Sequence, residues 1–217
     1  MEASKSSYSL QKTLTDPVFV SLLASNVLLI ALFYTDNSKA STIIITYYFQ
    51  SVLIGFFHVI RMGSLRNFDP SNFKVNGKPL QNTSKAKWGS VVFFMLHFGM
   101  FHFMYLIFLA VMMSEIPGRV DFLLLLGTLV AIIIGLIVET KEAIHYDRAK
   151  PPIMATLFFS PYLRVVPMHI FIILGFTNFK IETFIYFLLL KTATDILGYF
   201  IFSRRLKQVP TPFGQGF

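Results

Sequence analysis

Long apolar runs separated by short polar stretches dominate the chain. Six of these runs are long enough to cross a membrane, because a bilayer core of about 30 Å needs roughly 20 mostly apolar residues in a helix. Since unpaired backbone polar groups are too costly in lipid, helices are the expected structure. The pattern predicts an all-α, polytopic membrane bundle of about six transmembrane helices, at residues 17–34, 42–60, 88–113, 120–138, 163–177 and 181–202.

Composition supports a membrane environment. Of the 217 residues, 54% are hydrophobic and 14% are charged, whereas a soluble chain carries about 25% charged residues. Intrinsic disorder, collagen and coiled coil are therefore excluded. The absence of cysteine excludes thiolate catalysis, iron–sulfur clusters and a disulfide scaffold. The length suits a single membrane domain, predicted at residues 1–208, with residues 209–217 as a disordered tail.

Lysine and arginine residues are divided unequally between the two ends of the predicted spans. Fourteen of the 19 lie on one set of termini and loops and three on the opposite set, while Arg164 and Lys191 fall inside spans. The positive-inside rule then predicts that both termini are cytoplasmic. The net charge of +8 is explained by this orientation signal and by attraction to anionic headgroups.

The expected location is a cell membrane, specifically a bacterial inner membrane, with several passes. The expected partners are membrane lipids and other membrane subunits. Nucleic acid is not an expected partner, because no basic stretch is interleaved with stacking aromatic residues.

Local signals add detail between the spans. The longest loop, residues 61–87, contains turn signals that predict a small hairpin. Residues 153–163 predict a short helix at the surface, ahead of a span interrupted by Pro167. Small residues within the spans are expected to permit close helix contacts, and these are Gly55, Gly99, Gly127 and Gly135.

Polar side chains inside lipid cost a few kcal/mol each, so their positions point to function. At 1.5 Å per residue, several of them fall about 9–16 Å from the predicted cytoplasmic end, in four different spans, with Arg164 near the edge. A polar site shared between helices would have this distribution. The predicted polar cluster consists of Gln50, His97, Arg164, His169, Lys191 and Asp195.

Each member also has a simpler interpretation. Lys191 and Asp195 are four residues apart on one helix and could neutralise each other. Arg164 could extend to lipid phosphate or pair with Asp195, and His97 and His169 could bond to neighbouring carbonyls. His97 and His102 lie about 140° apart around their helix, so they cannot both face one site.

Four stretches resemble a known family. The chain is similar to uncharacterised bacterial and archaeal membrane proteins, domain of unknown function 6498, and this resemblance implies no activity. It rests on residues 47–62 (YYFQSVLIGFFHVIRM), 93–109 (FFMLHFGMFHFMYLIFL), 158–176 (FFSPYLRVVPMHIFIILGF) and 188–199 (LLLKTATDILGY).

The family pattern matches most of the predicted polar cluster. It has a His-aromatic-Gly unit at residues 97–99, an Arg–His pair at 164 and 169, and a Lys–Asp pair at 191 and 195. This chain has Gln50 where the pattern has an acidic residue, and His58 where it has Asn. Gln50 removes a possible proton or metal group, which weakens any mechanism that needs two carboxylates.

Several functions stay open at this point. The first is a small scaffold or accessory protein, whose buried polar cluster fixes helix packing. The second is an intramembrane enzyme or binding protein for a lipid or isoprenoid phosphate, with Arg164 and Lys78 holding the phosphate and His97 or His169 handling a proton with Asp195. The chain has no Asp-rich metal motif that such chemistry commonly uses.

Two further alternatives remain. His97 and His169 could hold a haem, or a metal ion together with Asp195. The same polar side chains could also form a path for protons or solutes. The sequence identifies no cofactor and leaves open whether the protein is catalytic.

Overall fold

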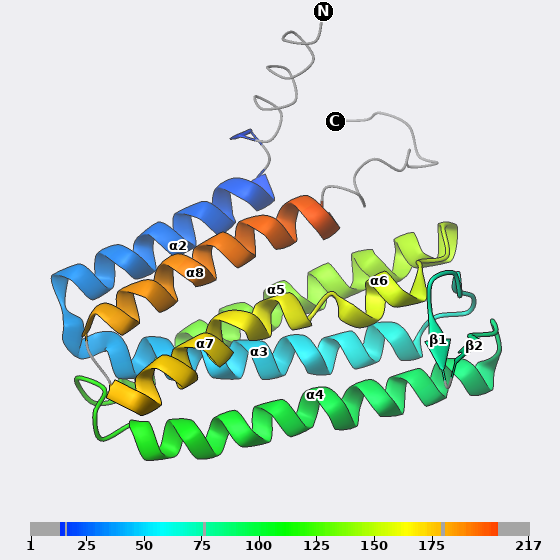
Figure 1. Ribbon diagram of the computed structural model, residues 1–217. Helices are drawn as coiled ribbons and strands as arrows, with labels where there is room; N and C mark the ends of the chain where they lie inside the picture. Colours follow the sequence, from blue (N-terminus) through cyan, green and yellow to red (C-terminus); the bar gives the residue numbers. More distant parts are fainter. Residues whose placement is uncertain (1–13, 16, 76, 179–180, 204–217) are drawn as a thin grey trace, which may run out of the picture.

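Each long apolar run forms a helix. The computed structural model describes residues 14–15, 17–75, 77–178 and 181–203, so the expected tail at 209–217 lies outside the described residues. Figure 1 shows the long helices running roughly along one common direction. Their bounds are α2 Pro17–Thr35, α3 Ala40–Gly63, α4 Ser84–Met112, α5 Phe122–Ala149, α7 Tyr162–Asn178 and α8 Ile181–Gly198.

Short elements connect and extend these helices. A 3₁₀ turn, Asn37–Lys39, joins α2 to α3, and α6, Met154–Phe159, precedes α7. A π-helical turn, Tyr199–Ser203, follows α8. In the long loop, β1 (Lys74–Val75) and β2 (Lys78–Pro79) pair in antiparallel register, which confirms the predicted hairpin.

Five helical stretches are long and apolar enough to cross a membrane: Asn37–Gly63, Ser84–Met112, Phe122–Ala149, Met154–Gly175 and Glu182–Ile201. A sixth apolar stretch in α2, Leu22–Thr35, is shorter. The predicted helical fold is therefore found, with five stretches whose length and composition suit a membrane span. A count of six complete spans stays a prediction.

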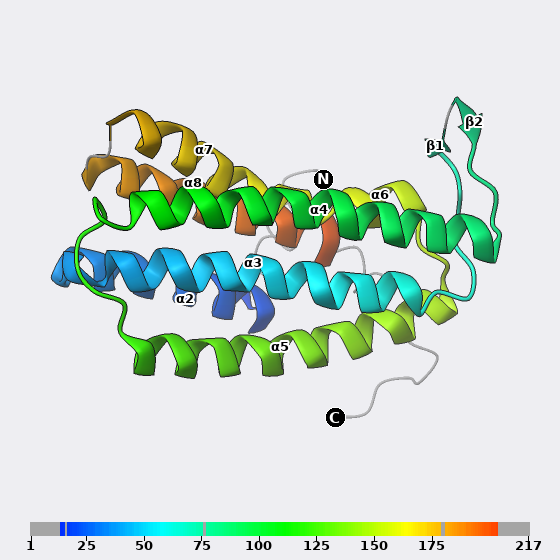
Figure 2. The same ribbon diagram turned by 90° about the horizontal axis from the view of Figure 1, so that it is seen from below.

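The helices pack as a chain of neighbours. α3 packs against α5 on one side and α4 on the other, α4 packs against α7, α7 against α8, and α8 against α2. Figure 1 places the α2–α8 pair on one side of the bundle and α4 on the opposite side. Figure 2 shows that α5 lies outermost on its own side, against α3. Two helices distant in sequence, α2 and α8, thus become direct partners.

The end of α5 differs from the sequence prediction. The fourth span was expected to end at residue 138, but α5 continues to Ala149. Its polar extension still has an inward face, since Ala143 and Asp147 are buried and Asp147 accepts two hydrogen bonds from Arg61 of α3, at 2.8 and 2.9 Å. Tertiary contacts therefore lengthen this helix beyond its apolar run.

The short helix before α7 is present but does not lie at the surface. Met154, Leu157 and Phe158 of α6 are buried, and α6 continues into α7 as one apolar stretch, Met154–Gly175. The long loop is joined to this region, because Asp69 N–H donates to the Pro152 carbonyl and Met154 N–H to the Asp69 carbonyl, both at 2.8 Å. The sequence predicted a short helix at the surface, and the burial of these three side chains places α6 in the interior instead.

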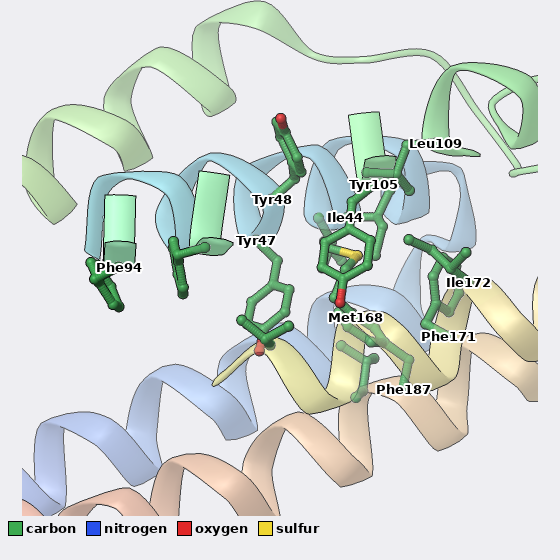
Figure 3. Close-up of a cluster of buried hydrophobic side chains, with 14 of the residues drawn as sticks. Ile44, Tyr47, Tyr48, Phe94, Tyr105, Leu109, Met168, Phe171, Ile172 and Phe187 are labelled. Carbon is green, nitrogen blue, oxygen red and sulfur yellow. The ribbon is translucent and has the colours of Figure 1, made fainter. Parts of the chain in front are cut away.

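Aromatic and aliphatic side chains fill the centre of the bundle. Figure 3 shows Tyr47 and Ile44 of α3 pointing toward Met168, Phe171 and Phe187 of α7 and α8. Phe171 and Phe184 are 1% and 0% exposed. Dense aromatic packing of this kind supplies helix association where lipid leaves little hydrophobic driving force.

Only one of the four expected glycines permits close packing within the chain. A Cβ atom at Gly55 would overlap the Phe98 ring, with Cδ1 at 2.7 Å. The corresponding positions at Gly99, Gly127 and Gly135 have nothing within 4 Å. The expectation is thus met at Gly55, where α3 meets α4, and is not met at the others, which face away from neighbouring helices.

Candidate functional site

The lysine and aspartate of α8 form an ion pair in the interior. Lys191 Nζ lies 2.8 Å from Asp195 Oδ2, and the two side chains are 6% and 13% exposed. The two residues are one helical turn apart, so the i,i+4 spacing brings them together on the face of α8 that meets α2. This contact follows the simpler of the two sequence interpretations, mutual neutralisation.

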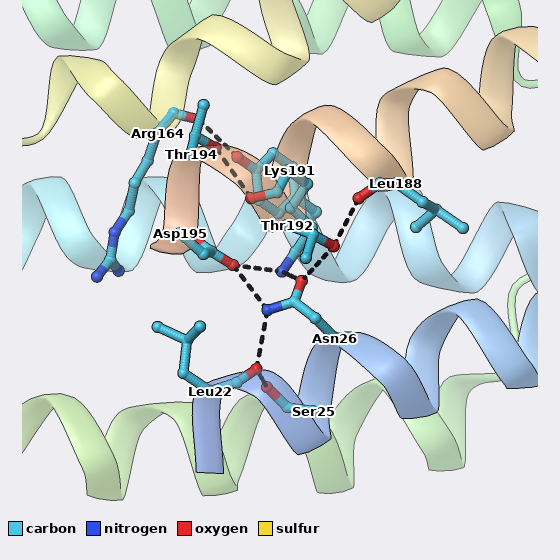
Figure 4. A network of polar contacts seen from close by, with 10 residues as sticks. Leu22, Ser25, Asn26, Arg164, Leu188, Lys191, Thr192, Thr194 and Asp195 are labelled. Atoms are coloured by element: carbon cyan, nitrogen blue, oxygen red, sulfur yellow. Dashed lines mark hydrogen bonds and ion pairs between the residues drawn. The ribbon is translucent and has the colours of Figure 1, made fainter. Parts of the chain in front are cut away.

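Asn26 of α2 completes the network, as Figure 4 shows. Its Oδ1 accepts from Lys191 Nζ at 3.0 Å and from the Thr192 hydroxyl at 3.2 Å. Its Nδ2 donates to Asp195 Oδ2 at 3.2 Å and to the Leu22 carbonyl at 2.9 Å. Asn26 is 2% exposed, and these four bonds use the full capacity of its amide.

A tyrosine links this network to α7. The Tyr47 hydroxyl donates to the Arg164 carbonyl at 2.6 Å, and Lys191 Nζ lies 5.5 Å from the centre of the Tyr47 ring. Pro167 lacks an N–H, so α7 loses the bond from residue 167 to the carbonyl of Leu163, which precedes Arg164. Tyr47 therefore joins α3 to the backbone of α7 and presents an aromatic face to a buried cation.

The histidines make separate contacts. His97 Nδ1 lies 2.7 Å from the Tyr162 hydroxyl, while His169 Nδ1 lies 3.2 Å from the Tyr105 hydroxyl. His102 contacts the Ser51 hydroxyl of α3 at 2.8 Å. His97 and His102 thus face different helices, as their spacing predicted, and His169 is exposed on α7.

The remaining two predicted residues lie apart from the network. Gln50 is half-buried and forms no hydrogen bond with the described residues. Arg164 is half-buried and makes no ion pair with Asp195; in Figure 4 its guanidinium extends away from Lys191. Of the six predicted residues, the structure joins Lys191 to Asp195 and gives the others different neighbours.

Arg164 instead lines a half-open cavity of about 100 Å³. The cavity lies where α3, α5, the α6–α7 junction and the end of α8 meet, and His58, Arg61 and Glu139 also line it. His58 is 8% exposed, and its Nε2 has no hydrogen-bond partner in the part of the chain that the structure describes. This second polar site differs from the Lys191 network in having groups whose bonding capacity is unused.

The described residues offer no ready metal centre. No group of three or more His, Asp or Glu side chains among them lies close enough to hold a metal ion. In the Lys191 network the only carboxylate, Asp195, is already bonded to Lys191 and Asn26. The haem alternative with His97 and His169 stays a prediction, for which the absorption spectrum of the purified protein is the direct measurement.

Comparison with known protein families identifies the family of this chain. The family of unknown function DUF6498 matches residues 9–211. The chain belongs to this family. The match confirms the resemblance carried by the four stretches in spans two, three, five and six, and extends it over nearly the full sequence. No curated protein and no solved structure matches this DUF6498 chain.

Sequence reasoning missed Asn26 and the cavity. Asn26 is the one strongly polar amide within an otherwise apolar run of the first span, so its position in lipid was a usable signal. His58 was recognised in the family pattern but was not included in the cluster. Its environment depends on α5 and α6, whose packing against α3 no local pattern specifies.

Proposed function

We propose that this DUF6498 protein is a small multi-pass membrane protein with a scaffold or accessory role, in which the Asn26–Lys191–Asp195 network fixes helix packing. The observation that carries the proposal is the closure of this network. Asn26 uses both donors and both acceptors within it, and Lys191 and Asp195 bond to each other and to Asn26. A network that is satisfied internally stabilises an arrangement of helices.

The position of the cavities relative to the network also supports a structural role. The cavity beside Arg164 and the apolar groove between α7 and α8 are lined by neither Lys191 nor Asp195. A catalytic centre needs space in which a substrate atom can approach its acid or base. The Lys191 pair has its neighbours at bonding distance instead.

The proposed orientation places the hairpin end in the cytoplasm. The start of α2, the end of α8, the β1–β2 hairpin and the α5–α6 junction lie toward the same end of the bundle (Figure 1). The two segments at this end, residues 61–87 and 139–164, contain ten Lys and Arg residues and four Asp and Glu residues. Such an excess is typical of cytoplasmic loops.

Two experiments test the proposal. Carbonate extraction should leave the protein in the membrane fraction, and reporters fused after residue 79 and after residue 118 should report opposite sides. A deletion strain should then be complemented equally by the wild type and by the Lys191→Met, Asp195→Leu double variant. If the double variant folds but fails to complement the deletion, the Lys191–Asp195 pair has a chemical role, and the scaffold role is contradicted.

A further inference from the structure

The cavity beside Arg164 has polar groups that form no hydrogen bond or ion pair with the described residues. Arg61 is bonded in two places to Asp147, so its charge is compensated. The Arg164 guanidinium has no partner among the described residues, and Glu139 is exposed on the opposite wall, from α5. With respect to residues 14–15, 17–75, 77–178 and 181–203, the cavity therefore presents one uncompensated cation and one uncompensated carboxylate.

His58 adds a buried acceptor. A neutral imidazole has one nitrogen that donates and one that accepts, so Nε2 is an acceptor when the ring hydrogen is on Nδ1. Nε2 is buried without a partner, and such a group loses free energy until a donor reaches it. A cavity of about 100 Å³ has room for a polar group, because a single water molecule needs only about 10–15 Å³.

The position of the cavity identifies the source of a ligand. Arg164 lies in the first turn of α7, Arg61 in the last turn of α3, and Gly198 is the last residue of α8. All three helix ends lie toward the hairpin, where the Lys and Arg excess of the loops favours phosphate groups. The cavity thus lies toward the end of the bundle at which the loops carry this excess of positive charge.

We propose that this cavity binds the headgroup of a zwitterionic phospholipid that carries a phosphodiester and a primary ammonium. The Arg164 guanidinium holds the phosphate oxygens, for which its planar pair of donors is suited. The Glu139 carboxylate and His58 Nε2 accept hydrogen bonds from the ammonium. A headgroup with hydroxyl groups in place of the ammonium, such as that of phosphatidylglycerol, would leave the Glu139 charge uncompensated.

Lipid retention in native mass spectrometry tests this site. The purified full chain is mixed with equal amounts of phosphatidylethanolamine and phosphatidylglycerol, and the bound lipid is identified. We expect the wild type to retain phosphatidylethanolamine preferentially. Arg164→Gln should weaken retention of that lipid by about tenfold, the value of one lost charge-assisted hydrogen bond, while Arg148→Gln, at an exposed arginine near the same end, should not.

A second pair of variants tests the selectivity without touching a buried group. Glu139→Gln should remove the preference for phosphatidylethanolamine and favour phosphatidylglycerol, whereas Glu142→Gln, at another exposed glutamate of α5, should keep the wild-type ratio. Equal retention of both lipids by the wild type would overturn the proposal. Equal losses in Arg164→Gln and Arg148→Gln would overturn it as well, by showing general surface attraction. The scaffold role is judged by complementation and is independent of these outcomes.

Discussion

Asn26 Oδ1 accepts a hydrogen bond from Lys191 Nζ at 3.0 Å, across 165 positions of sequence. This bond, with those of Asn26 to Asp195 and Thr192, joins the first long helix to the last. It stabilises the amine in an apolar interior where an isolated charge would be costly. The contact explains how α8 tolerates a lysine that is only 5% exposed in its middle.

Breaking the ion pair from one side should be more damaging than removing both charges. Asp195→Leu leaves the Lys191 charge buried, and such a change costs about 3–5 kcal/mol. Lys191→Met together with Asp195→Leu removes both charges and should cost much less. Thermal unfolding of the detergent-purified variants measures the difference. A double variant as unstable as Asp195→Leu would mean that the pair itself, and not its compensation, is essential to packing.

The close approach of α3 and α4 should depend on Gly55. Its added Cβ would overlap the Phe98 ring, so Gly55→Ala should lower the free energy of unfolding by about 1–3 kcal/mol through overpacking. Gly99→Ala, whose Cβ meets nothing within 4 Å, is the matched control. The second change Phe98→Ala should reduce the additional effect of Gly55→Ala. Equal melting temperatures for the two glycine variants would contradict this view.

The loop between α4 and α5 should not tolerate a side chain at residue 118. Gly118 has a φ of +83°. A Cβ atom added there would overlap the Ser38 backbone and would lie 2.8 Å from the Ser38 Cα. The left-handed conformation alone costs a non-glycine residue about 1–2 kcal/mol. Gly77→Ala shares the positive φ, at +75°, but has no neighbour within 4 Å. We expect Gly118→Ala to lower the melting temperature more than Gly77→Ala does.

Acid should weaken the junction between the α2–α3 turn and α5. Asp121 accepts from the Leu124 N–H and from Lys39 Nζ, at 3.1 and 3.2 Å, and these bonds hold its pKa below the usual 3.8. Because the folded-state pKa is lower, the stabilisation is present above pH 3.8 and is lost as the pH falls through the folded value. Melting temperature measured between pH 7 and pH 3 follows this loss.

Two substitutions separate the contributions of Asp121. Asp121→Asn retains an acceptor for the Leu124 N–H but removes the charge, so its melting temperature should vary less with pH than that of the wild type. Asp121→Ala removes both interactions and should be less stable than Asp121→Asn at neutral pH. If Asp121→Asn showed the full acid dependence of the wild type, Asp36 or Asp69, whose pKa values are also lowered, would be responsible.

Local signals predicted much of this protein and missed specific parts for identifiable reasons. The hairpin in residues 61–87 follows from its turn residues, and the Lys191–Asp195 contact follows from their spacing. The short helix α6 was expected at the surface, but Met154 is 0% exposed. Depth along the helix axis placed His169 beside Lys191, yet depth does not specify the direction around a helix, and His169 is exposed and bonded to Tyr105.

The sequence by itself determined the helical fold, because apolar runs of about 20 residues that suit a bilayer must satisfy their backbone bonds internally. It also determined that Lys and Arg are divided unequally between the two ends of the predicted spans. Only the tertiary structure decided that Asn26 would meet Lys191 and that His58, Glu139 and Arg164 would share a cavity. The physical reason is that these contacts depend on which helix faces pack together, and side chains far apart in sequence select those faces collectively.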